Sequence, residues 1–196
     1  MSAIALAVFV ALYFVRAGYG IFRTAQWGPS VPNKLGWVLM EAPVFITMFV
    51  LWAQSGVGFA MPAYAFFLLF QLHYLQRSFI FPLLLKGKSR MPVSILLMGV
   101  VFNVLNGLMQ AGGLFFFPTV PLDAGCSYLL TPRALAGLVL FFAGMGINLH
   151  SDHVIRHLRR PGDTRHYLPA RGMYRYVTSA NYFGELVEWT GFAVLT

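Results

Sequence analysis

The chain has few charged residues and a single cysteine. Charged residues occupy 10% of its 196 positions, hydrophobic residues occupy 58%, and the mean hydropathy is +0.68. Soluble domains carry about a quarter charged residues, so this composition excludes an ordinary soluble globular domain. Cys126 has no second cysteine to pair with, which excludes an internal disulfide and leaves packing to hold the fold together.

The sequence also lacks the usual signatures of soluble nucleotide and metal sites. No GxGxxG motif follows a predicted strand, so a dinucleotide would not be held by a Rossmann turn. His150, His153 and His157 have a suggestive spacing, but no cysteine or carboxylate pair completes a zinc shell, and we expect no metal site. No internal repeat is visible, which counts against a small transporter built from inverted repeats.

Long apolar stretches are what the chain has in abundance. Each stretch approaches the roughly 20 residues that cross a bilayer core. We therefore predict an all-α fold, a polytopic transmembrane helical bundle that forms one membrane-embedded domain over residues 1–196. The six predicted spans are 2–15, 37–53, 60–85, 93–117, 134–150 and 177–195. Because the last span ends without a polar tail, we expect a seventh, C-terminal helix in the complete protein.

The net charge of +8 predicts the orientation in the membrane. Basic residues gather in the first, third and fifth connections between spans, whereas the second connection has none. The positive-inside rule then places these three connections in the cytoplasm and the N-terminus on the far side. A bacterial inner membrane and the endoplasmic reticulum are both compatible with this pattern.

Ionisable groups at membrane depth are costly and point to function. Glu41 lies in the second predicted span, and Tyr74 and Arg77 lie in the third. At about 1.5 Å per residue, Glu41 lies about 10 Å from the cytoplasmic end of its span, Arg77 about 12 Å and Tyr74 about 16 Å. Glu41 either supports Tyr74 as a hydrogen-bond donor to a substrate carbonyl, or neutralises Arg77 beside an ordinary core tyrosine.

A second polar stripe begins in the fifth predicted span. Asn148, Asp152 and Arg159 are separated by four and eleven residues, which places them on one helical face. A carboxylate accepts from hydroxyl groups and an arginine binds phosphate oxygens, so the stripe suits a sugar-phosphate ligand such as a nucleotide. A solvated helix end at the membrane surface explains the same pattern equally well.

A third polar stripe lies in the last predicted span. Asn181, Glu185 and Glu188 share one helical face, and Trp189 offers an aromatic wall beside them. The stripe faces either a ligand or another helix, and the residues alone do not decide between these two interpretations.

Three segments resemble the steroid 5α-reductase family of integral membrane reductases. They are QLHYLQRSF at 71–79, GMGINLHSDHVIRHLRRPGD at 144–163 and YLPARGMYRYVTSANYFGELVEWTGFA at 167–193. The resemblance implies a seven-helix membrane fold, NADPH as cofactor and reduction of the C4–C5 double bond of a 3-oxo-4-ene steroid. Hydride would add to C5 and a proton to C4.

The resemblance also implies roles for individual residues. Tyr74 and Glu41 would hold the steroid ketone and stabilise the enolate as the catalytic pair, and Trp189 would help to wall the substrate cavity. We expect a monomer that binds a steroid or related lipid, membrane lipids and no nucleic acid. The residues implied for the cofactor are Asn148, Asp152, Arg159, Tyr167, Asn181, Glu185 and, near the adenosine end, Lys88.

Two positions depart from the family pattern, and other functions stay open. Met40 stands where the family often has a glutamine, and Leu168 stands where it often has an arginine, so substrate range and cofactor affinity could differ. Without the family's final helix, a fragment of this length is expected to be inactive. The alternatives are an isoprenylcysteine-type membrane methyltransferase, a reductase of a sterol, polyprenol or enoyl thioester, and a non-enzymatic lipid-binding protein or transporter.

Overall fold

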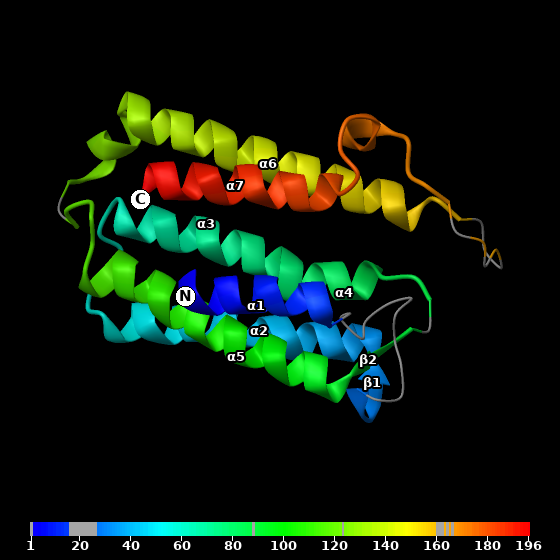
Figure 1. Cartoon of the computed structure of the whole chain (residues 1–196). Helices are drawn as coiled ribbons and strands as arrows, with labels where there is room; N and C mark the ends of the chain where they lie inside the picture. Colours follow the sequence, from blue (N-terminus) through cyan, green and yellow to red (C-terminus); the bar gives the residue numbers. More distant parts are fainter. Residues whose placement is uncertain are drawn as a thin grey trace. The chain divides into compact units, whose positions relative to one another are not determined.

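The chain is mostly helical, as the apolar stretches predict (Figure 1). The computed structural model describes residues 2–15, 27–87, 89–122, 124–159, 163, 165 and 167–196. Within these residues, three helices are long and apolar enough to cross a membrane. They are α2 (Asn33–Gln54), the run Val93–Phe116 formed by α5 (Val93–Ala111) and the π-helical η4 (Gly112–Phe116), and α6 (Pro132–Arg156).

The other three predicted spans also correspond to helical segments, although their role as spans stays a prediction. The first is α1 (Ser2–Phe14) and the last is α7 (Ala180–Leu195). The third predicted span contains α3 (Ala63–Leu75), the π-helical η3 (Gln76–Ile80) and α4 (Phe81–Leu84), which follow one another without a break. The π-helical turn begins two residues after Tyr74, and such turns are frequent at functional sites.

The structure adds one feature that the sequence analysis did not predict. Two short strands, β1 (Ser30–Pro32) and β2 (Arg90–Pro92), pair in antiparallel register, with Val31 opposite Met91. Arg90 Nε donates a hydrogen bond to Ser30 Oγ at 3.0 Å across this pair. The sheet therefore ties together the segments that lead into α2 and α5.

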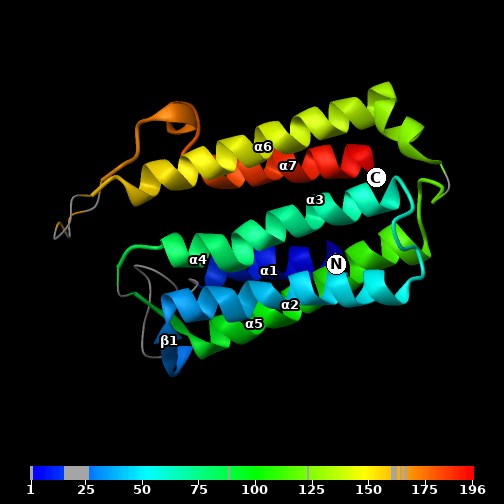
Figure 2. The ribbon, with the colours of Figure 1, turned by 180° about the vertical axis from the view of Figure 1, so that it is seen from behind.

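The chain divides into two compact units, which we describe separately. Unit 1 comprises Met1–Thr47 and Tyr74–Leu108, and unit 2 comprises Met48–His73 and Met109–Thr196. In unit 1, the first part of α2 and α5 run side by side from the sheet in the same direction (Figures 1 and 2). A Cβ atom added to Gly107 would lie 2.9 Å from the Thr47 Cβ and 3.3 Å from the Val44 carbonyl oxygen, so the glycine permits this close approach.

In unit 2, α6 and α7 pack against each other in antiparallel directions, as both views show (Figures 1 and 2). Pro132 opens α6, and the Thr131 side chain caps it by accepting from the Ala134 backbone N–H at 3.3 Å. A Cβ atom added to Gly144 would overlap the Glu188 backbone, so the two helices meet nearly backbone to backbone. The glycines at this interface, seven residues apart on each helix, are Gly137 and Gly144 on α6 and Gly184 and Gly191 on α7.

Candidate functional site

Tyr74 lies at the end of α3 and is buried, with 7% of its surface exposed. Its hydroxyl oxygen accepts a hydrogen bond from Asn106 Nδ2 of α5 at 2.8 Å. The amide belongs to the same unit as the tyrosine. The phenol oxygen therefore has a polar neighbour on α5.

Glu41 lies on α2 and also meets an amide from α5. Asn103 Nδ2 donates to Glu41 Oε2 at 3.2 Å and to the Met40 carbonyl oxygen at 2.8 Å. Asn103 is buried, with 4% exposure. We call Tyr74 and Glu41 the donor pair, and each member is held by one asparagine of the same helix.

Sequence reasoning missed both asparagines, although the sequence contains a signal for them. Asn103 and Asn106 are three residues apart inside the apolar segment 100–108, so they lie on one helical face. Amides at membrane depth need hydrogen-bond partners, and that need is the sign that they face protein rather than lipid.

Two further residues of unit 1 bear on the predictions. Arg77 is buried in η3, and its guanidinium lies 4.9 Å from the Trp37 ring centre and 4.8 Å from that of Phe81. These cation–π contacts help a membrane helix to tolerate a buried cation. At the position that departs from the family pattern, the Met40 side chain packs over Gly99 of α5, where an added Cβ atom would overlap it.

Four of the residues implied for the cofactor gather in unit 2. Asn148 Nδ2 of α6 donates to the Asn181 carbonyl oxygen at 3.1 Å and to Glu185 Oε1 at 3.2 Å, both on α7. Asn181 Nδ2 in turn donates to Asp152 Oδ1 at 3.4 Å. We call Asn148, Asp152, Asn181 and Glu185 the amide–carboxylate cluster, and its spacing follows from the close packing of α6 on α7.

Tyr174 joins this cluster from the connection between α6 and α7. It lies in the 3₁₀ turn η6 (Gly172–Arg175), and its hydroxyl donates to Asn181 Oδ1 at 3.5 Å. Burial raises the pKa of Tyr174 to about 12, and the negative charge of Asp152 acts in the same direction. Gly172 has φ +59° and abuts the His150 ring, so the turn needs glycine at this point. Sequence reasoning did not single out Tyr174.

Arg159 lies beyond α6, which ends at Arg156, so the prediction that it shares a helical face with Asn148 and Asp152 is wrong. Arg159 and Tyr167 instead belong to a group around Asp163. The Tyr167 hydroxyl donates to Asp163 Oδ2 at 2.6 Å, and the Arg165 backbone N–H donates to Asp163 Oδ1 at 2.9 Å. These hydrogen bonds, with the Arg159 charge as a smaller contribution, lower the pKa of the Asp163 carboxyl. Leu168, the second departure from the family pattern, is 94% exposed. Lys88 lies outside the described residues.

Glu188 of the polar stripe on α7 and its neighbour Trp189 both contact His73 of α3. His73 Nδ1 lies 2.9 Å from Glu188 Oε1, and both side chains are buried. The Trp189 ring packs edge to face on the His73 ring, with 4.7 Å between centres. Glu188 therefore contacts α3, whereas Glu185 is a member of the amide–carboxylate cluster.

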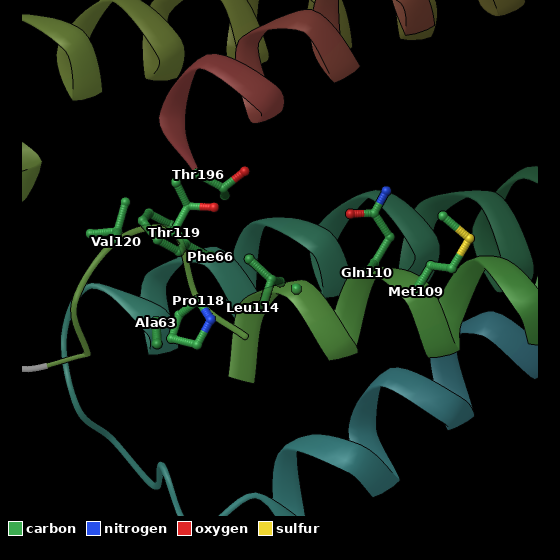
Figure 3. Close-up of a pocket in the computed structure, with 10 residues that line it drawn as sticks. Ala63, Phe66, Met109, Gln110, Leu114, Pro118, Thr119, Val120 and Thr196 are labelled. Carbon is green, nitrogen blue, oxygen red and sulfur yellow. The ribbon is translucent and has the colours of Figure 1, made fainter. Parts of the chain in front are cut away.

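Unit 2 also contains a pocket that none of the predicted site residues line (Figure 3). Its volume of about 110 Å³ is well below the roughly 300 Å³ at which small-molecule sites begin, so it is not a steroid site. The pocket is lined by Ala63, Phe66, Met109, Gln110, Gly113, Leu114, Pro118, Thr119, Val120 and Thr196.

Among the described residues, no group of three or more histidine, cysteine, aspartate or glutamate side chains could hold a metal ion.

The chemistry of the amide–carboxylate cluster fits a nucleotide cofactor. Asn148 and Asp152 are 3% and 4% exposed, and carboxylate and amide groups of this kind bind ribose hydroxyls. Arg159 is exposed and carries the positive charge that phosphate oxygens require. The residues present in unit 2 thus match the polar groups of a sugar phosphate.

Comparisons with known proteins agree with these residue patterns. The family model for 3-oxo-5-alpha-steroid 4-dehydrogenase matches residues 89–196. The chain is 37% identical over 194 residues to 3-oxo-5-alpha-steroid 4-dehydrogenase 1 of Mus musculus, covering 97% of this chain and 74% of the relative. It is 37% identical over 199 residues to a steroid 5-alpha-reductase of Gossypium hirsutum, covering 98% and 75%.

A third relative, 3-oxo-5-alpha-steroid 4-dehydrogenase 2 of Sus scrofa, is 36% identical over 191 residues, which cover 95% of this chain and 73% of the relative. These alignments extend well beyond the segment that the family model matches, and they include the helices of both units. The chain therefore belongs to the 3-oxo-5-alpha-steroid 4-dehydrogenase family of oxidoreductases, also called the steroid 5α-reductases, as its motifs indicated.

Proposed function

We propose that this protein is an NADPH-dependent reductase of the C4–C5 double bond of 3-oxo-4-ene steroids. Family membership supports the reaction class. The observation that carries the site assignment is the buried Tyr74 hydroxyl, held by Asn106, in the same unit as Glu41. A buried phenol that is fixed by a neighbouring amide is suited to donate a hydrogen bond to a ketone.

In this proposal the donor pair binds the C3 carbonyl oxygen. Tyr74 donates its hydroxyl hydrogen to that oxygen, and Glu41, in its protonated form, adds a second donor. Negative charge grows on the oxygen as the double bond is reduced, so preorganised donors stabilise the transition state more than the ground state. The resulting enolate then takes a proton at C4 and returns to a ketone.

The amide–carboxylate cluster and Arg159 would hold NADPH. Asp152 and the amides of Asn148 and Asn181 suit ribose hydroxyls, and Arg159, with Lys88, suits the phosphates. When bound, NADPH supplies the hydride that adds to C5. Trp189 would form an apolar wall beside the reduced nicotinamide.

The membrane arrangement completes the proposal. With six spans, the basic connections, and with them the proposed cofactor residues, would lie on the cytoplasmic side, and the protein would act as a monomer. Steroids partition into the apolar phase while NADPH stays in water, so a site that opens to both requires this arrangement.

The test is a cofactor-consumption assay on the purified full-length protein in lipid nanodiscs. Testosterone-like and progesterone-like 3-oxo-4-ene ketones are offered with NADPH, and 5α-reduced products are identified by mass spectrometry. A parallel reaction with S-adenosylmethionine and an isoprenylcysteine acceptor tests the methyltransferase alternative. Oxidation of NADPH matched by saturated steroid is expected, and methyl transfer without steroid reduction would overturn the proposal.

A further inference from the structure

We propose that Asn106 is a positioning residue that aims the hydroxyl hydrogen of Tyr74 at the ligand carbonyl. This inference rests on the proposed function, because it assigns Asn106 a part in the same reaction. Asn106 would not touch the steroid or the cofactor, and would act only through the tyrosine.

The polarity of one contact carries the argument. The Asn106 Nδ2 atom lies 2.8 Å from the Tyr74 hydroxyl oxygen. An amide NH₂ group has only hydrogens to offer, so the phenol oxygen must accept in this bond. The single hydrogen of the phenol is therefore directed to an acceptor other than the Asn106 nitrogen. A ketone oxygen is such an acceptor.

The same contact also strengthens the phenol as a donor. When a hydroxyl oxygen accepts a hydrogen bond, the hydroxyl is polarised and its own donated bond becomes stronger. Tyr74 is only 7% exposed, so water competes little for this bond. Asn106 thus both orients the donor and stabilises the negative charge that the phenol oxygen gains as it donates.

The position of Asn106 is itself fixed by the neighbouring turn of α5. Asn103, one turn earlier on the same face, donates to the Met40 carbonyl oxygen and to Glu41, and so anchors α5 to α2. Gly107, directly after Asn106, brings α5 close to Thr47 and Val44 of α2. These contacts fix the position of the Asn106 amide along the axis of α5.

The decisive experiment reverses the polarity of the contact without changing its shape. Asn106→Asp replaces the amide donor with a carboxylate, which accepts the Tyr74 hydrogen and removes it from the ketone. We expect kcat to fall by a factor on the order of 10²–10³, as for the loss of one oxyanion donor, with little change in the Michaelis constant for NADPH. Asn106→Leu, which keeps the size but makes no hydrogen bond, should lower kcat by a smaller factor.

A pH profile separates this role from simple packing. As the pH falls, the new carboxyl group is protonated and can donate again, so the activity of Asn106→Asp should recover towards acid pH. Glu41, Arg77 and His73, which directly precedes Tyr74, are also titratable, and all three remain in Asn106→Leu. The profile of Asn106→Leu should therefore follow the wild type, and the recovery should be specific to the aspartate.

Gln110→Glu is the matched control, because Gln110 lies one turn further along α5 and lines the small pocket. It introduces a carboxylate into the same helix and should keep wild-type kcat and pH dependence. If Asn106→Asp retains wild-type kcat with an unchanged pH profile, Asn106 has no positioning role, although the proposed function stands.

A spectroscopic measurement keeps the two proposals distinguishable. The ring carbon that bears the hydroxyl is labelled with carbon-13 in all tyrosines, and the Tyr74 signal is assigned by its loss in Tyr74→Phe. The signal should leave its wild-type position in both variants if the phenol accepts from the amide, and should move further in Asn106→Asp, where the phenol also donates to the new carboxylate. An unshifted signal would overturn the inference. If the variants show these shifts but the wild type reduces no steroid, the polarity of the contact stands and the proposed function fails.

Discussion

Single hydrogen bonds decide which atoms of the candidate site can donate. The donor pair meets two amides of α5, and in both contacts the nitrogen of the amide is the donor. The Tyr74 oxygen therefore accepts from Asn106 and the Glu41 oxygen from Asn103, and both amides lie on one face of α5. The chemistry that each residue can perform depends on which atom donates in its hydrogen bond, more than on which helix carries the residue.

Removal of the phenol hydroxyl should abolish turnover and spare cofactor binding. Tyr74→Phe deletes a donor that acts mainly in the transition state, so kcat should fall by a factor on the order of 10²–10³. The Michaelis constant for NADPH should stay close to that of the wild type, because the amide–carboxylate cluster, which we propose holds the cofactor, is in unit 2. Tyr64→Phe, the same change earlier in α3, is the control, and substantial steroid reduction by Tyr74→Phe would remove the tyrosine from the mechanism.

Tyr174 should make the stability of the protein sensitive to strongly alkaline pH. Burial and the charge of Asp152 raise its pKa from 10.0 to about 12, so the folded state holds its proton longer than the unfolded chain. The stabilisation is fully present below pH 10.0 and is lost as the pH rises towards 12. Unfolding measured across this range should show a steeper loss for the wild type than for Tyr174→Phe. Tyr176→Phe should behave like the wild type, and identical curves for all three proteins would contradict the assignment.

Helix packing sets the spacing of the cofactor residues at the scale of the element. The glycines of α6 and α7 let the helices approach so closely that Asn148 reaches both the Asn181 backbone and the Glu185 side chain. A side chain larger than hydrogen at these positions would separate the helices and break the cluster. The cluster is therefore a property of the pair of helices and not of either one alone.

A pair of alanine substitutions on α6 tests this dependence. A Cβ atom at Gly144 would overlap the Glu188 backbone, so Gly144→Ala should destabilise the protein by about 1–3 kcal/mol and raise the Michaelis constant for NADPH. Gly146, two residues later, has nothing within 4 Å of an added Cβ atom. Gly146→Ala should be neutral or stabilising by roughly 0.5–1 kcal/mol. Denaturant unfolding in detergent measures both, and equal stabilities would contradict the packing argument.

The helical elements were predictable from the sequence because apolar runs of membrane length leave little choice of structure. The predicted span 37–53 lies within α2, which begins earlier, at the polar residue Asn33. The predicted span 134–150 lies within α6, which ends later, at the polar residue Arg156. The strands β1 and β2 were not predictable, since three residues with proline show no alternating pattern. The partners of Tyr74 and Glu41 were missed because spacing shows which residues share a face but not which helix that face meets.

The whole molecule carries its two groups of site residues in different units. The donor pair with its asparagines belongs to unit 1, and the amide–carboxylate cluster with Tyr174 belongs to unit 2. The spacing correctly predicts that Asn148 and Asp152 share a face of α6, because they are one helical turn of four residues apart. The same step of four residues puts Asn181 and Glu185 on one face of α7. It could not anticipate the Asp163 group, which depends on the shape of a connection without periodicity.

Orientation in the membrane gives a prediction for the complete chain. Cys126 is exposed in the connection that precedes α6, which the positive-inside rule places on the far side of the membrane. A membrane-impermeant maleimide should label the wild type from that side only and should not label Cys126→Ser. Ser89→Cys in the Cys126→Ser background should be labelled only from the cytoplasmic side. Labelling of Cys126 from the cytoplasm would reverse the proposed topology.

The contact between α6 and α7 also bears on protein engineering. A library that seeks to exchange NADPH for NADH has no freedom at Gly137, Gly144, Gly184 or Gly191, because each holds two backbones within touching distance. Useful diversity lies instead at exposed positions such as Arg159 and Leu168, where a new side chain can be added without parting the helices. If the proposed cofactor site is correct, altered cofactor choice is therefore to be sought in the connection, and the four glycines between α6 and α7 are to be kept.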